Sequence, residues 1–272
     1  MDDIRERFYV GMYSRIVREA NSVRMDEESE FIVMRSRIFI DQADFVIEKC
    51  KNATTPLHRG LLVLANAKKL KTSTEKAAIV PKDEENQSIY FNLCKSTVLL
   101  EANMPGEALS CVITIDHPEA AAIRVHSYIG LFRIDLAEKE LPRVTNEVLR
   151  TLCTAYVSLY KGNESVKSSL FALQDLSERF EMTPLLSNTI SCCHFALGEW
   201  ETAQMTLQNA VEKFPNDESI RINNAVATLR TNDYEKIQSQ ISLVTSTKNH
   251  YTDYIDQLLK DFDDTAQRLS KE

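Results

Sequence analysis

Apolar residues recur along most of the chain at the three- and four-residue spacing of amphipathic helices, and the clearest unit covers residues 184–217. The segment Pro184–Leu197 predicts a helix that begins at a proline, because the fixed φ and missing N–H of proline suit the first helical position. Gly198–Trp200 predicts a turn. The next segment carries small and apolar residues at helical spacing, at Ala203, Leu207 and Ala210. This pattern indicates a helix–turn–helix with one buried face.

The same landmarks return 34 residues later. Asn232 takes the place of Gly198, and asparagine tolerates the left-handed conformation that glycine supplies at a turn. The other matched positions are Asp233, Tyr234, Ile237, Ile241 and Val244. A 34-residue helix–turn–helix with a small–aromatic turn is typical of the tetratricopeptide repeat. The clearest repeats are therefore predicted at residues 184–217 and 218–249.

Weaker copies of the unit lie upstream. First helices are predicted at Ile89–Leu100, Pro118–Leu131 and Thr151–Tyr160. Four of the six glycines fall in predicted helix-to-helix turns, at positions 11, 106, 162 and 198. Gly60 and Gly130 instead lie inside predicted first helices, where glycine weakens a helix and close packing of two helices would explain it. Residues 68–88 predict a helix end followed by an exposed connector.

The C-terminal residues carry apolar side chains at roughly heptad spacing. We expect a capping helix at about residues 250–270, because an end repeat must cover its exposed face. The predicted fold is all-α: a single, strongly curved α-solenoid of tetratricopeptide-like repeats over residues 1–272. Stacked repeats form a superhelix whose first helices line a concave groove. Such an array typically recognises another protein.

Charge and composition exclude several classes of function. The net charge of −8 argues against general binding to a nucleic-acid backbone. No segment approaches the roughly 20 consecutive apolar residues of a membrane span, so direct membrane insertion is not expected. The first residues are mixed in charge with no apolar stretch after them, unlike a secretory signal. We therefore expect a cytoplasmic protein whose six cysteines are reduced and buried.

No residue pattern predicts a catalytic, cofactor or metal site. The five histidines lack the helical spacing of zinc and di-iron sites. The sequence contains no phosphate-binding glycine loop and no Gly-x-Ser-x-Gly motif. His194 follows Cys193, but adjacent helix positions point about 100° apart and cannot form the hydrogen bond of a nucleophile and its base. We expect no enzyme activity.

The geometry of the repeats predicts which side chains line the groove. In the repeat that begins at Pro184, one stripe of the first helix contains Leu185, Asn188, Cys192 and Phe195. The same offsets give Ser219, Ile222, Val226 and Leu229 in the next repeat, and Glu119, Ala122, His126 and Ile129 in the repeat that begins at Pro118. Packing within the array is the alternative explanation for each. Asn188, Phe195 and His126 are the predicted partner contacts, whereas the turn position of Trp200 favours packing between repeats.

Four stretches resemble the epsilon subunit of coatomer, the COPI vesicle coat. Phe8–Ala20 resembles the family's opening "FY-x-G-x-Y…EA" helix pair, and Leu131–Val144 resembles its "RLDLA-x-KEL" helix. Leu185–Ala210 is similar to its best-marked repeat, "CH-x-x-x-G-x-W-x-x-A". Asp261–Asp264 is similar to the C-terminal "DFDRL" ending, with Asp264 in place of the arginine.

This resemblance implies a structural coat subunit bound to the C-terminal domain of the coatomer alpha subunit. In that family the repeats curl around a hairpin that projects from the partner. The implied process is retrograde Golgi-to-ER and intra-Golgi transport, with the protein in the cytoplasm and peripheral on Golgi and COPI vesicle membranes.

Two other functions stay open. A repeat-type co-chaperone, or another peptide-binding adaptor, grips a terminal carboxylate with a clamp of lysine, asparagine and arginine. The equivalent positions here are Asn188, Cys192, Ser219 and Asn223, which lack the cations. A helical hydrolase with an unrecognised site is the more remote alternative, and no residue pattern supports it.

Overall fold

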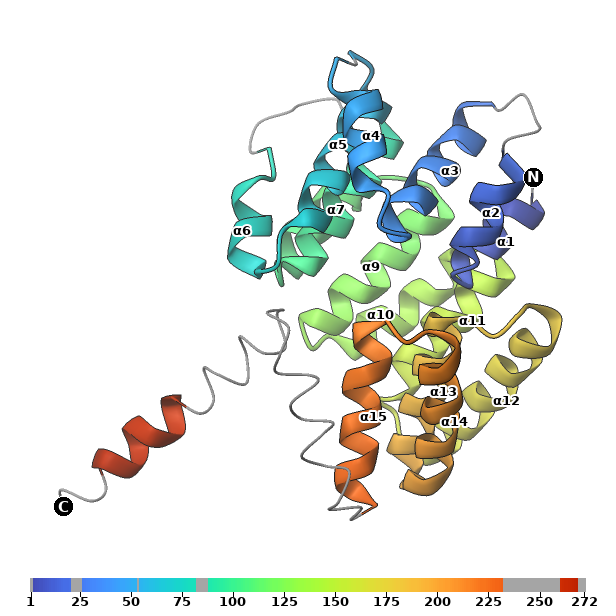
Figure 1. Cartoon of the computed structure of the whole chain (residues 1–272), viewed down its shortest axis with the longest axis vertical. Coiled ribbons are helices and arrows are strands. Elements are labelled where there is room, and N and C mark those ends of the chain that lie inside the picture. Colours follow the sequence, from blue (N-terminus) through green and yellow to red (C-terminus); the bar gives the residue numbers. More distant parts are fainter. Residues whose placement is uncertain (1, 21–25, 53, 82–87, 232–259, 269–272) are drawn as a thin grey trace.

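The computed structural model describes residues 2–20, 26–52, 54–81, 88–231 and 260–268 (Figure 1). Over these ranges the chain forms helices and no strands, which confirms the predicted all-α solenoid. The helices of the N-terminal half are α1 (Asp2–Tyr9), α2 (Tyr13–Glu19), α3 (Glu27–Phe39), α4 (Ala43–Cys50), α5 (Pro56–Lys69), α6 (Ser73–Ala78), α7 (Ile89–Glu101) and α8 (Pro105–Val112). They are followed by α9 (Pro118–Gly130), α10 (Ile134–Glu140), the short 3-10 helix η2 (Leu141–Arg143), α11 (Glu147–Ser158), α12 (Asn163–Arg179), α13 (Pro184–Leu197), α14 (Trp200–Lys213) and α15 (Glu218–Arg230).

The odd-numbered helices form one continuous layer. From α3 to α15, each odd-numbered helix packs against the next odd-numbered helix as well as against an even-numbered neighbour. The even-numbered helices pack beside this layer (Figure 1). This arrangement is that of a solenoid in which each unit buries its apolar face on the following one.

The predicted helix pair of the clearest unit is confirmed. α13 has the predicted bounds, and the stripe of Ala203, Leu207 and Ala210 on α14 is buried. Helix α14 begins at Trp200, which was predicted to lie in the turn. α7 and α9 also begin at the predicted residues. Gly106 lies in the first turn of α8 rather than in a connecting turn, and the predicted connector after residue 68 contains the short helix α6. The first helix predicted at Thr151–Tyr160 is α11, which begins four residues earlier, at Glu147, and ends at Ser158.

Two C-terminal predictions fall wholly or partly outside the described residues. The landmarks of the second repeat, from Asn232 to Val244, all lie outside them. Of the expected capping helix at about 250–270, only residues 260–268 are described, and they are helical with every residue exposed. The capping role therefore stays a prediction.

Five helix-to-helix turns of the described chain share one geometry. In each, one residue has a φ between 57° and 86°, and the N–H of the next residue donates to the carbonyl five positions before it. This is the Schellman ending, which satisfies carbonyls that the helix leaves unpaired. The left-handed residues are Gly11, Asp41, Asn103, Phe132 and Gly198. Four of them are of the types that adopt this conformation at little cost, and Phe132 is the exception.

Side-chain caps fix where most odd-numbered helices begin. A side-chain oxygen of the preceding residue accepts a hydrogen bond from a backbone N–H in the first turn, which offsets one of the unpaired donors there. These capping residues are Asp26 (α3), Thr55 (α5), Ser88 (α7), Asn146 (α11), Thr183 (α13) and Asp217 (α15).

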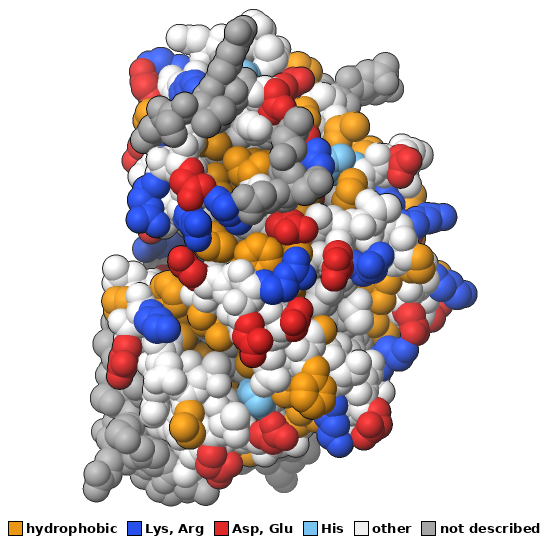
Figure 2. Space-filling model, turned by 90° about the vertical axis from the view of Figure 1, so that its right-hand side faces the viewer, with side chains coloured by type: hydrophobic (Ala, Val, Ile, Leu, Met, Phe, Trp, Pro, Cys, Tyr) orange, Lys and Arg blue, Asp and Glu red, His pale blue; other side chains and the backbone are white. Residues whose placement is uncertain are grey.

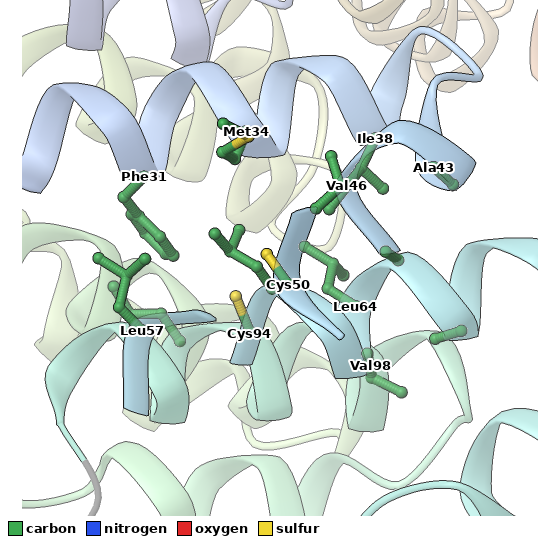
Figure 3. Close-up of a cluster of buried hydrophobic side chains, with 14 of the residues drawn as sticks. Phe31, Met34, Ile38, Ala43, Val46, Cys50, Leu57, Leu64, Cys94 and Val98 are labelled. Carbon is green, nitrogen blue, oxygen red and sulfur yellow. The ribbon is translucent and has the colours of Figure 1, made fainter. Parts of the chain in front are cut away.

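A large apolar cluster lies mainly between α3, α4, α5 and α7 (Figure 3). Phe31 and Met34 of α3 face Leu64 of α5 and Cys94 of α7 across it. Gly60 allows α5 and α7 to approach, because a Cβ at this position would lie 2.8 Å from the Phe91 Cα. The close helix packing expected at Gly60 is thus confirmed.

The N-terminal helices α1 and α2, which we call the N-terminal clasp (residues 2–19), pack back on the middle of the array. Phe8, Val10 and Met12 share a buried cluster with residues of α11, α12 and α13. The Thr183 hydroxyl donates to the Val10 carbonyl, and the position of a Gly11 Cβ would be 3.5 Å from the Leu185 Cβ. The clasp thereby joins the start of the chain to its second half.

A buried ion pair connects α3, α9 and the clasp. Arg35 Nη1 of α3 donates to Glu119 Oε2 of α9 at 2.6 Å, and both side chains are buried. The Arg35 guanidinium lies 4.4 Å from the Phe8 ring centroid and 4.8 Å from that of Phe31. The Tyr9 hydroxyl donates to Glu119 Oε1 at 3.3 Å. Burial, with the nearby Glu119 charge, raises the pKa of Tyr9 far above its ordinary value, so the phenol stays a donor.

We expect Arg35→Met to lower the free energy of unfolding by about 3–5 kcal/mol, because it leaves the Glu119 carboxylate buried without its cation. Urea denaturation followed by circular dichroism measures this. The matched control is Arg133→Met, which removes an exposed pair with Asp135 and should leave the free energy of unfolding almost unchanged. Equal effects of the two substitutions would contradict a special role for the buried pair.

Alanine substitutions at Gly60 and Gly106 should have different effects on the stability of the fold. Gly60→Ala should destabilise by about 1–3 kcal/mol, since the added methyl meets backbone of α7 and this outweighs the gain in helix propensity. Gly106→Ala meets nothing within 4 Å and should be neutral or stabilise by up to about 1 kcal/mol. Thermal unfolding of both variants compares them, and a stabilised Gly60→Ala variant would refute the close approach of α5 and α7.

Candidate partner-binding surface

Side-chain contacts connect four neighbouring odd-numbered helices in a row. The His126 ring of α9 lies 4.9 Å from the Tyr156 ring of α11, measured between centroids. The Tyr156 hydroxyl is 3.4 Å from the Thr189 hydroxyl of α13. One residue before Thr189, the Asn188 Oδ1 accepts a hydrogen bond from Asn223 Nδ2 of α15 at 3.0 Å. We call the predicted stripe residues on α9, α13 and α15, together with these contacts, the inner row.

Three predicted groove residues are engaged within the chain itself. Glu119 is held by Arg35 and Tyr9. Ala122 is buried in the apolar cluster between α9, α10 and α11. Leu185 is half-buried beside Gly11 of the clasp. For these positions the packing explanation accounts for the residue type.

The other predicted groove residues keep part of their surface accessible. Val226 and Leu229 are exposed, at 39% and 46% of their full area. The half-buried members of the inner row are His126, Ile129, Asn188, Cys192, Phe195, Ser219 and Ile222. The accessible part of the row therefore runs from the end of α9 to α15 and excludes the start of α9.

Phe195, besides being a half-buried member of the row, packs on an aromatic ring of the next helix. Its ring stacks on Trp200 at a centroid distance of 5.2 Å with 29° between the planes. The Arg230 guanidinium lies 5.0 Å from the Trp200 ring, so Trp200 links α13, α14 and α15. The position of Trp200 agrees with packing between repeats.

Tyr156, Thr189 and Asn223 were missing from the predicted stripes although they hold the row together. The helix that carries Tyr156 begins after Asn146 and has no initial proline, so the repeat landmarks did not locate its stripe. Thr189 and Asn223 lie one position beside the predicted offsets. A polar residue directly after the same predicted offset in two successive repeats, Thr189 after Asn188 and Asn223 after Ile222, was the available signal.

Cys193, His194 and His126 each have a defined environment within the fold. Burial raises the pKa of Cys193 to about 11, so this thiol is protonated at neutral pH. His194 Nδ1 forms a hydrogen bond with Glu199 Oε2 at 2.7 Å. Desolvation lowers the pKa of His126, which keeps this ring neutral. Within the described ranges, no three His, Cys, Asp or Glu side chains are grouped as they would be around a metal ion.

Charged residues of both signs are interspersed on the face shown in Figure 2, and hydrophobic side chains form small areas between them. Such a face does not present the single-signed field of a nucleic-acid binder. No helix in the part of the chain that the structure describes combines the length and apolar content needed to cross a membrane.

Comparison with known proteins identifies the family of the chain. A sequence profile described as "Coatomer epsilon subunit" matches residues 1–270. The chain belongs to the coatomer epsilon subunit family. This confirms the resemblance carried by the four sequence stretches. Members of the family are structural components of a coat.

Curated members of the coatomer epsilon family are distant but similar over most of their length. Coatomer subunit epsilon of Dictyostelium discoideum is 24% identical over 242 residues, covering 79% of this chain and 81% of the relative. Coatomer subunit epsilon-1 of Arabidopsis thaliana is 25% identical, covering 84% and 82%. Coatomer subunit epsilon of Caenorhabditis elegans is 24% identical, covering 88% and 87%.

Buried thiols should make this coatomer epsilon family member less stable in alkali. Burial raises the pKa of Cys94 and Cys153 to about 12, from 9.0 for an exposed thiol. The unfolded chain therefore ionises first, and the stabilisation present below about pH 9 is lost as pH rises toward 12. Each thiol contributes up to about 1.4 kcal/mol per pH unit. Urea denaturation from pH 8 to 10.5 measures the slope. Cys153→Ala should reduce it, and a slope equal to that of the wild type would contradict this origin.

Proposed function

We propose that this protein is a structural subunit of the COPI coatomer coat that binds the C-terminal domain of the alpha subunit. The proposed site is the accessible part of the inner row, from the end of α9 to α15. The process we propose is retrograde Golgi-to-ER and intra-Golgi transport, with the protein in the cytoplasm and peripheral on Golgi and COPI membranes through the coat. Membership of the coatomer epsilon family supports the assembly into a coat.

The division of the inner surface supports this choice of site. In the first half of the array, Arg35 and Glu119 bridge α3 and α9 and are buried, and the clasp contacts the start of α13. In the second half, the row keeps accessible apolar side chains, including Val226 and Leu229, beside the carboxamides of Asn188 and Asn223. Apolar area with a few oriented polar groups is the composition of a specific protein interface.

The single observation that carries the proposal is that this row is both continuous and accessible. Its members come from α9, α13 and α15, with α11 joining them through Tyr156. A partner segment lying across these helices would contact several repeats at once. Binding would then depend on the stacking of the repeats, as expected for a solenoid.

Charge introduced in the row should abolish binding without unfolding the chain. We expect Asn188→Lys, His126→Glu and the double variant Val226→Glu/Leu229→Glu each to weaken binding to the purified C-terminal domain of alpha at least about tenfold, because the charge is desolvated on association. Isothermal titration calorimetry measures the affinity, and circular dichroism checks the helical content.

The matched control is Met205→Glu on α14. Met205 is 66% exposed and lies on α14, an even-numbered helix that contributes no residue to the row. The Met205→Glu variant should bind the alpha-subunit domain with the affinity of the wild type. Undiminished binding by the row variants, with or without an effect of the control, would remove the row from the proposed interface.

A further inference from the structure

An exposed apolar edge lies where α9 and α11 end. Phe132 is 83% exposed, Tyr160 56% and Leu131 41%. Leu131 and Phe132 form the turn from α9 to α10, and Tyr160 belongs to the turn from α11 to α12. An ion pair joins Lys161 of the second turn to Glu138 of α10, the helix that follows the first turn. We call Leu131, Phe132 and Tyr160 the aromatic edge.

The backbone at Phe132 makes this residue a costly choice for the fold. Its φ is 57°, in the left-handed region where a bulky side chain is strained. The N–H of the next residue, Arg133, donates to the Tyr128 carbonyl at 2.8 Å and completes the Schellman ending. The same ending is made elsewhere in this chain by Gly11, Asp41, Asn103 and Gly198. Glycine or asparagine would therefore serve the turn better.

Burial does not repay this cost, because most of the Phe132 side chain is in contact with solvent. Strained residues persist where the surroundings fix them and are enriched at functional sites. A solvent-exposed aromatic ring with two rotatable bonds loses little conformational entropy on docking and buries a large area. The combination of backbone strain and solvent exposure at Phe132 is what we expect of a residue whose side chain binds a partner.

The aromatic edge is continuous with the inner row. Ile129, the last stripe residue of α9, precedes Leu131 by two positions and is itself half-buried. Tyr160 follows α11, the helix whose Tyr156 contacts His126 of the row. A partner seated on the row thus meets the edge at the carboxyl-terminal ends of α9 and α11.

We propose that Phe132 is an anchor residue that inserts into an apolar pocket of the same partner protein, with Leu131 and Tyr160 around it. This inference rests on the proposed function, because the occupant is the alpha-subunit domain. It extends the interface from the inner row over the rim of the array. The left-handed turn holds the ring outward, so the anchor is preorganised before association.

The deciding experiment is Phe132→Gly, which should separate stability from binding. Glycine relieves the backbone strain, so the denaturation midpoint should stay equal or rise. Loss of the anchor should weaken binding to the alpha-subunit domain at least about tenfold, as for an aromatic hot spot. Phe132→Asn is a second variant that also tolerates the turn, and it should lose the same affinity.

Two controls match the substitution. Phe171→Ala removes an aromatic ring that is 75% exposed on α12 and should leave affinity unchanged. Asn103→Gly makes the equivalent backbone change in the α7–α8 turn and should also leave it unchanged.

The outcomes are distinguishable from those of the proposed function. If the wild-type chain does not bind the alpha-subunit domain, the proposed function fails, and this inference with it. If the wild type binds and the row variants do not, but Phe132→Gly binds as tightly as wild type, the anchor alone is overturned. A wild type that is dimeric by light scattering, together with a monomeric Phe132→Gly variant, would assign the edge to a second copy and also overturn it.

Discussion

The buried pair of Arg35 and Glu119 is the constraint on which the shape of this molecule depends. Two charges taken out of water are stable only when they meet each other with good geometry, so α3 must reach α9 at a fixed distance. Tyr9 and the Phe8 ring complete the surroundings of the pair and hold the clasp against the same point. The pair thereby joins α3 and the clasp to α9, and the row from the end of α9 to α15 keeps accessible side chains.

Local features were predictable where the sequence signal is local. Proline at the start of α13 and glycine in the left-handed position after it lie within a few residues of the structure they determine, so both bounds of that helix followed from the pattern. The burial of Ala203, Leu207 and Ala210 followed from helical spacing for the same reason. Gly106 was misplaced because Asn103, and not a glycine, supplies the left-handed residue of that turn.

The candidate site was predictable only in part, because its limits are set by distant residues. Offsets within a repeat placed Asn188, Val226 and Leu229 on accessible surface. The same offsets gave Glu119, whose cation lies 84 positions away in the chain, and no repeat pattern reports such a distance. Periodicity tells which side of a helix is turned inward, but it does not tell whether that inward space is already filled.

The clasp also changes how such a chain can fold. Repeat arrays ordinarily build up by nearest-neighbour stacking and can begin anywhere along their length. Here the Val10 carbonyl accepts a hydrogen bond from the hydroxyl of Thr183, 173 positions later in the chain. At ribosomal speeds of about 5–20 residues per second, Thr183 is made roughly 10–30 seconds after Val10. Helix α3 can cover part of the apolar surface of α1 and α2 soon after synthesis, but the part that packs on α13 stays uncovered until α13 has left the ribosome. An array built of local units thus acquires a folding step that spans the chain, because the contacts of the first helices are complete only when α13 is in place.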